Sequence, residues 1–320
     1  MRTLLALAAL PLLATFAPFH LYREPPVPAR ATIAFKPIAL DREDPYRTSL
    51  GGLTFLGGWE VSSNDPRFGG ISAMHVEDGR VLAISDSGSI IEYALPGQPP
   101  RLSIRPLPLG PGPGGKLDRD SEALAVHGSR AWIGFERHNA IWRYGLAGWR
   151  AEAAAEPHAM RRWPGNQGSE AMVRLPDGRF LVFSEQRLRP DGSSEVILFD
   201  GDPAVPGTRT ASLGYRAPLK YRITDAALLP DGRLLFLNRR FSLLHGISAK
   251  LTVGDMPRLS AGSVLTGTEI AHFDEPINVD NMEAVSVVRE PERTILWIGS
   301  DDNFTALQRT LLLKFMLDEE

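Results

Sequence analysis

Five short segments of this chain begin with the same three-residue step, which ends in alanine and has a carboxylate before that alanine in four of the five copies. Alternating apolar residues, a turn and a second, more hydrophobic run follow each step. The copies are Ile71-Ser72-Ala73, Ser121-Glu122-Ala123, Ser169-Glu170-Ala171, Thr224-Asp225-Ala226 and Met282-Glu283-Ala284. The repetition predicts one structural unit that is built five times.

The spacing of these copies indicates a β-propeller. They recur at intervals of 48 to 58 residues, which matches a four-stranded blade better than the period of a helical solenoid. We predict an all-β propeller of four-stranded blades with five repeats, or six blades if residues 32–40 and 50–61 form a degenerate blade. Because the innermost strands of all blades line one axial channel, the repeated carboxylates are expected to converge there.

Each copy is predicted to contain a strand, a tight turn, a second strand, a loop and a third strand. Turn dipeptides such as Asp78-Gly79 and Asp177-Gly178 contain glycine, which readily adopts the positive φ of a hairpin turn. The second strands carry consecutive apolar residues, as strands buried on both faces do. The last copy has only three strands, so we expect the run at residues 50–61 to pair into it and close the ring.

The chain divides into three predicted segments. Residues 1–20 have a charged start, an apolar middle and a small-residue exit, which is typical of a signal peptide; an uncleaved N-terminal anchor is the alternative. Residues 21–30 are a proline-rich tether, and residues 31–320 form a single propeller domain. We therefore expect a periplasmic or secreted protein that contacts a membrane only through an uncleaved N-terminal segment.

Composition narrows the classes of function. The formal net charge is −3, which argues against a nucleic-acid partner because such proteins usually carry a strongly basic surface. The chain has no cysteine, so disulfides, thiolate nucleophiles and zinc–thiolate sites are excluded. A GxSxG motif and metal-ligand histidine spacings are also absent. We expect a monomer that acts on a small anionic or ester molecule.

The repeated carboxylates are the candidate metal ligands. Clusters of oxygen donors suit hard cations, Ca²⁺ above Mg²⁺, because Ca²⁺ accepts six to eight ligands in loose geometry. Two of the acids, Glu122 and Glu170, are also candidate catalytic groups. The alternative is that these acids accept backbone N–H bonds and latch neighbouring blades without a metal. The four candidate ligands are Glu122, Glu170, Asp225 and Glu283.

A second ring of polar residues follows the apolar second strands. Its leading members are Asp86, Glu136, Glu185, Asn238 and Asp301. Next to this ring, His138 is the candidate proton carrier. Arg187 and Arg239 are candidates for binding an anionic substrate, because guanidinium groups match its oxygens bidentately. Asp302 and Asn303 are the remaining predicted substrate-binding residues.

Several segments carry a resemblance to a known family. They are FGGISAM, DSEALAV, GSEAM with LPDGRFLVFSE, ITDAALLPDGRLLFLNRRF, and VDNMEAVSV followed by SDDNFTALQRTLLLKF. Over residues 51–315 the chain resembles the bacterial phytase-like propellers named for the esterase-like activity of phytase. The resemblance implies an exported propeller with a hydrolase or binding role. The chain is more distantly similar to gluconolactonase-type propellers, which hold a divalent cation in the axial channel.

The resemblance to phytase-like proteins does not extend to true phytases. The Asp-Ala-x-Asp-Asp-Pro-Ala signature of the calcium-dependent phytases has no counterpart in this sequence, so phytate hydrolysis is not expected. Two hypotheses follow. The first is a metal-assisted hydrolase of phosphate esters, carboxylic esters or lactones. The second is a non-catalytic propeller that binds a cell-envelope partner or a glycan, with the repeated acids purely structural.

Overall fold

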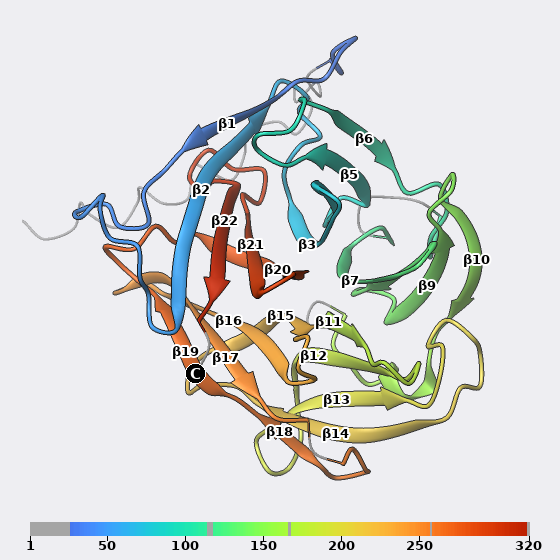
Figure 1. Cartoon of the computed structure of the whole chain (residues 1–320). Helices are drawn as coiled ribbons and strands as arrows, with labels where there is room; N and C mark the ends of the chain where they lie inside the picture. Colours follow the sequence, from blue (N-terminus) through green and yellow to red (C-terminus); the bar gives the residue numbers. More distant parts are fainter. Residues whose placement is uncertain (1–25, 114–117, 166–167, 257, 319–320) are drawn as a thin grey trace, which may run out of the picture.

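The structure is a computed structural model that describes residues 26–113, 118–165, 168–256 and 258–318. Its strands form five sheets arranged as blades around one axis, which confirms the predicted five-bladed β-propeller (Figure 1). A short 3₁₀ helix, η2 (His158–Met160), lies between the second and third blades. Within the described ranges, no helix has the length and apolar character needed to cross a membrane.

The blades are described from the inner strand outward. Blade one contains β3 (Ile71–Glu77), β4 (Arg80–Ser85), β5 (Ser89–Ala94) and β6 (Leu102–Pro106). Blade two contains β7 (Ser121–His127), β8 (Arg130–Phe135), β9 (Ala140–Gly145) and β10 (Arg150–Ala155). Blade three contains β11 (Ser169–Arg174), β12 (Phe180–Leu188), β13 (Ser194–Phe199) and β14 (Thr210–Arg216), with β18 (Val264–Thr266) added in parallel.

The remaining two blades complete the ring. Blade four contains β15 (Arg222–Leu228), β16 (Leu234–Ser242), β17 (Gly246–Gly254) and β19 (Thr268–Phe273). Blade five contains β20 (Asn281–Glu290), β21 (Arg293–Asp301), β22 (Leu311–Leu317), β2 (Leu53–Ser63) and β1 (Ile33–Pro37). The inner strands of neighbouring blades contact one another around the whole ring.

The ring closes through β2, as predicted. This strand pairs with β22 from Leu53↔Leu317 to Glu60↔Leu311, and β1 pairs along its outer side. Figure 1 shows β1 and β2 at the outer edge of the blade that holds β20, β21 and β22. The alternative of a sixth blade is wrong, because both N-terminal strands are used to complete blade five.

The hydrophobic core consists of layers between neighbouring blades. Each of five buried clusters joins side chains from two adjacent blades, for example Phe183 of blade three with Phe236 of blade four. Four of the five alanines of the repeated step lie in these layers and are 0–1 % exposed. They are Ala73, Ala123, Ala171 and Ala284. A small residue fits here because the inner strand approaches the next blade closely.

One end of the channel collects the functional residues, and we call it the mouth. The antiparallel pairing places the start of each inner strand beside the end of its second strand, as in Ser121↔Phe135 and Asn281↔Asp301. The loops from outer strands to the next inner strands also end there. The two predicted polar rings therefore lie at the same end of the molecule.

Candidate functional site

A register shift near the start of each inner strand determines which side chain enters the channel. In blade two the shift lies between Ser121 and Ala123, and the other four blades have one at the corresponding point. Such a bulge re-aims one side chain and leaves it out of the ladder. The residues inside the shifts are Ser72, Glu122, Glu170, Thr224 and Glu283.

Three of these residues bring carboxylates together. Glu122 interacts electrostatically with Glu170 and Glu283, and Glu170 also interacts with Glu283, although the three lie on different blades. All three side chains are partly buried. The geometry thus gathers three of the four predicted ligands around one centre.

The prediction that Asp225 occupies the same repeat position as the three glutamates is wrong by one residue. In blade four the shift encloses Thr224, so Asp225 occupies the position of the buried alanine in the other blades. Its Oδ2 accepts a hydrogen bond from the Val285 N–H of blade five (2.8 Å), and its Oδ1 accepts one from Ala226 N–H (2.8 Å). Burial raises the pKa of Asp225 well above its ordinary value, while both backbone donors oppose that rise. Asp225 therefore latches blade four to blade five.

The second polar ring lies against the first. Glu136 follows β8, Glu185 lies near the end of β12 and Asp301 ends β21. Glu136 interacts electrostatically with Glu122 and Glu170, and Glu185 does so with Glu170 and Glu283. The two rings predicted from the sequence form one acidic site at the mouth.

Burial and mutual repulsion raise the pKa values of these acids. Burial is the main cause for Glu122 and Glu170, whose pKa values lie well above the ordinary range, and the nearest acids add to it. Burial also raises the pKa values of Glu136, Glu283 and Asp301, each to about 7. Near neutral pH the cluster therefore holds protons or needs cations to balance its charge.

Blade four supplies a cation where the other blades supply acids. By register, Asn238 stands at the position of Phe135 and is likewise fully buried, where it accepts a hydrogen bond from the Tyr215 hydroxyl (2.8 Å), so the position of Glu136 falls to Arg239. The next residue, Arg239, forms an ion pair with Glu283, with Nε 3.1 Å from Oε1. Its guanidinium lowers the pKa of Glu283 and of Glu170 relative to burial alone. The predicted substrate-binding role of Arg239 is compatible with this position at the mouth.

In the described part of the chain, one close group of three acids lies at blade two. Carboxylate oxygens of Asp120, Glu122 and Glu136 all lie within 4.8 Å of one another. Among the described residues, no lysine, arginine or histidine forms an ion pair with any of the three. An uncompensated trio of oxygen donors fits a hard divalent cation such as Ca²⁺.

Two members of this trio were not among the ligands predicted from the sequence. Asp120 precedes the repeated step directly, and Glu136 follows the second strand of the same blade. The sequence carries a signal for each: Asp120 is an oxygen donor close to Glu122, and Glu136 belongs to the second polar ring. Their meeting depends on the pairing of β7 with β8, in which Ser121 lies opposite Phe135.

The structure places His138 and Arg187 in contact with acids other than the repeated ones. His138 Nε2 lies 3.0 Å from Asp118 Oδ1, in the loops that flank β7 and β8. Arg187 Nε lies 4.0 Å from Glu195 Oε2 on β13, and that oxygen also accepts a hydrogen bond from Trp163 Nε1 (2.9 Å). Arg187 is therefore directed toward the outer part of blade three.

Asp302 and Asn303 shape the loop between β21 and β22. The Asp302 carboxylate accepts hydrogen bonds from the N–H groups of Gly70 and Phe304 and from the Thr310 hydroxyl, each at 3.0 Å. Asn303 donates its backbone N–H to Asp301 Oδ1 (2.7 Å). The first of these contacts links blade five to the entry of blade one, so Asp302 has a structural task in addition to any role in binding.

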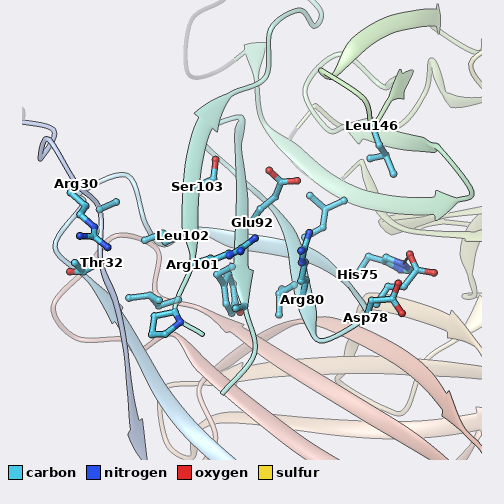
Figure 2. Close-up of a pocket in the computed structure, with 18 of the residues that line it drawn as sticks. Arg30, Thr32, His75, Asp78, Arg80, Glu92, Arg101, Leu102, Ser103 and Leu146 are labelled. Carbon is cyan, nitrogen blue, oxygen red and sulfur yellow. Dashed lines mark ion pairs between the residues drawn. The ribbon is translucent and has the colours of Figure 1, made fainter. Parts of the chain in front are cut away.

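A large cavity lies away from the acids. It has a volume of about 1190 Å³ and lies on the outer flank of blade one, beside the segment that leads into β1. Figure 2 shows His75, Arg80, Glu92 and Arg101 around it. Glu92 is paired with Arg105, with Oε2 2.6 Å from Nη2. The cavity lining contains none of the repeated acids, so the chemistry that these acids suggest belongs to the mouth.

Comparison with known proteins gives a family match. The family model "Phytase-like: Esterase-like activity of phytase" matches residues 66–304. No curated protein matches the chain. Among solved structures, a glutaminyl cyclase from Myxococcus xanthus is similar at 9 % identity and a TM-score of 0.48, covering 83 % of this chain and 97 % of its own. A calcium-binding regucalcin from Agrobacterium tumefaciens is similar at 12 % identity and 0.43, covering 78 % and 91 %. TM-scores below 0.5 leave both structures without bearing on function.

Proposed function

The chain belongs to the phytase-like family whose model is described as esterase-like activity of phytase, and we propose that it is a metal-assisted hydrolase of phosphate esters, carboxylic esters or lactones. The observation that carries the proposal is the trio of Asp120, Glu122 and Glu136, whose carboxylate oxygens lie within 4.8 Å of one another. These residues would hold the cation, for which Ca²⁺ suits best. When bound, such an ion polarises the substrate oxygen and activates water.

The other residues of the mouth supply the remaining requirements of hydrolysis. Burial and the neighbouring Glu185 raise the pKa of Glu170 well above its ordinary value, which suits its carboxyl group to donate a proton to a leaving group. Arg239 lies 3.1 Å from Glu283 at the same centre. Its guanidinium can orient an anionic or carbonyl oxygen of the substrate.

The setting of this activity is also part of the proposal. We propose that the protein acts in the periplasm or after secretion, as the signal-like residues 1–20 suggest; these residues lie outside the described ranges. We also propose that it acts as a monomer on a small anionic or ester substrate. The acidic mouth and the net charge of −3 argue against a nucleic-acid partner.

Removal of one ligand tests the proposal. Glu122→Gln and Glu136→Gln are each expected to reduce calcium-dependent hydrolysis of p-nitrophenyl esters or phosphates by about 100-fold or more. Their midpoints of thermal unfolding in EDTA should stay unchanged or rise, because each amide relieves repulsion among buried acids. Activity and melting are measured on the same preparations, with Ca²⁺ and with EDTA.

Glu77→Gln is the matched control. Glu77 is an exposed acid at the opposite end of β3, so this variant should hydrolyse the same substrates at the rate of the unmodified chain. Full activity of the EDTA-treated protein, or of the Glu122→Gln variant, would rule out the metal-assisted reaction.

A non-catalytic propeller is the second candidate. It is favoured by Asp225 and Asp302, whose carboxylates are occupied by hydrogen bonds that connect blades. In that case a broad screen of esters, phosphates and lactones would show no turnover, while the same mouth bound an envelope component or a glycan. A positive screen that depends on Ca²⁺ decides for the hydrolase.

A further inference from the structure

Most of the strongly exposed apolar side chains lie on the mouth side of the molecule. The most exposed large hydrophobic residues in the described part of the chain are Leu307 (95 %), Leu243 (93 %), Tyr46 (90 %), Leu244 (88 %) and Leu219 (87 %). All except Tyr46 lie in loops that connect strands at the mouth. We call Leu219, Leu243, Leu244 and Leu307 the leucine rim.

The leucine rim spans two neighbouring blades of the five. Leu219 lies in the loop from β14 to β15, which leads into blade four, and Leu243 and Leu244 lie at the tip of the β16–β17 hairpin of the same blade. Leu307 lies in the β21–β22 loop of blade five. Blades four and five are neighbours whose inner strands contact each other, so the rim is a continuous sector of the mouth.

Two contacts hold the parts of the rim near one another. Leu244 and Leu307 line the same open hollow, of about 990 Å³, together with Phe241. Arg240 at the base of the hairpin lies over the ring of Tyr221, 5.2 Å from its centroid, and so connects the hairpin to the loop that contains Leu219. The rim leucines therefore lie at the tips of loops that together form one surface.

Positive charge accompanies the exposed leucines. Lys220 follows Leu219 directly, and Arg240 precedes the hairpin tip. Neither side chain forms an ion pair with a described residue, whereas Arg309, near Leu307, is paired with Asp280 at 3.3 Å. Lys220 is exposed and can meet negative charge outside the protein, while the half-buried Arg240 adds positive charge beside the hairpin.

This combination favours a lipid surface over an enclosed ligand. Leucines that are nearly fully exposed line no enclosed pocket, so a broad surface that covers the loops is needed to bury all four. Apolar tips flanked by lysine and arginine are the feature with which peripheral proteins enter the headgroup and acyl boundary of anionic bilayers. We propose that the leucine rim docks the mouth of the propeller on an anionic lipid bilayer.

Docking in this way has a consequence for access to the site. Arg240 adjoins Arg239, which is paired with Glu283 in the acidic site, so the rim and the acids share one end of the molecule. A docked protein would hold the acidic site next to the lipid surface. The inference concerns binding alone and holds whether or not the acids hydrolyse an ester.

A single fluorescent label can test the docking. Because the chain has no cysteine, Leu244→Cys offers one position for an environment-sensitive dye on the full chain. Vesicles of phosphatidylcholine with phosphatidylglycerol are expected to shift its emission to the blue, and phosphatidylcholine alone to shift it less. Adding Lys220→Gln to the labelled protein should raise the lipid concentration at half-shift about threefold or more, since a surface cation contributes to binding anionic lipid.

Val205→Cys is the matched control for the label. Val205 is also exposed (44 %), but it lies in the β13–β14 loop at the opposite end of the channel, so its emission should not change. An unchanged emission at Leu244→Cys, or an equal shift at Val205→Cys, would overturn the docking surface. Equal shifts with neutral and anionic vesicles would overturn the role given to the cations. Thermal melting of each labelled variant verifies the fold.

Discussion

At the scale of single residues, carboxylates one position apart in the repeat have different environments: some face the channel, and one hydrogen-bonds to the neighbouring blade. Glu122, Glu170 and Glu283 lie inside the register shifts and interact electrostatically in the channel, where burial raises the pKa of each. Asp225 lies one residue later and accepts the Val285 N–H of the neighbouring blade. Under the proposed function, stability and chemistry are therefore carried by separate acids, and substitutions can distinguish the two roles.

Asp225→Ala tests the latch. The substitution leaves the buried N–H groups of Ala226 and Val285 without their present acceptor, which should lower the free energy of unfolding by about 2–3 kcal/mol. Asp225→Asn keeps one acceptor oxygen and should lose less. Urea denaturation measures both, and hydrolysis by the folded fraction should persist. A loss of activity with unchanged stability would instead place Asp225 in the reaction.

The same one-residue difference shows what the sequence can predict at this scale. The repeated step correctly identified Glu122, Glu170 and Glu283 as residues that converge. It misplaced Asp225, because a register shift is a property of backbone pairing and Thr224-Asp225-Ala226 reads like the other copies. For the same reason, the approach of Asp120 to Glu136 could not be derived, since it requires the register of two strands.

At the scale of elements, the closing strand determines whether the ring is complete. β2 lies between β1 and β22, and its Leu53 is fully buried in the layer between blades four and five. The need for this strand could be predicted, because the last repeat lacked one strand and an open sheet edge is unfavourable. The pattern of repeats did not predict that β1 would pair with β2 and add a fifth strand to this blade.

Deletion of the closing strand has a specific expected outcome. A chain that begins at residue 64 lacks β1 and β2, exposes the edge of β22 and opens two core layers, so it should aggregate and lose cooperative thermal unfolding. A chain that begins at residue 31 keeps both strands and should remain monomeric on gel filtration with a single sharp transition. If the chain from residue 64 is monomeric and melts cooperatively, then β20, β21 and β22 alone are enough for blade five, and the closing strand is not required.

At the scale of the whole molecule, the five blades bring acids from separate repeats into one buried centre, and this arrangement couples stability to pH. Burial raises the pKa values of Glu136, Glu283 and Asp301 to about 7 in the folded chain, while in the unfolded chain such acids titrate near 4. Between these values the unfolded chain releases protons that the folded chain keeps. Stability is therefore highest below about pH 4 as far as these groups are concerned, and it falls as pH rises.

The expected measurement is a loss of stability between about pH 5 and pH 7 in EDTA, of up to about 3 kcal/mol for each acid that titrates independently. A cation at Asp120, Glu122 and Glu136 favours the ionised carboxylates, so millimolar Ca²⁺ should restore the midpoint of thermal unfolding most strongly above pH 7. Glu136→Gln should flatten the pH dependence and weaken the calcium effect, whereas Glu77→Gln should change neither. Stability that rises with pH in EDTA, or that ignores Ca²⁺ at pH 8, would contradict an acidic cation site at the mouth.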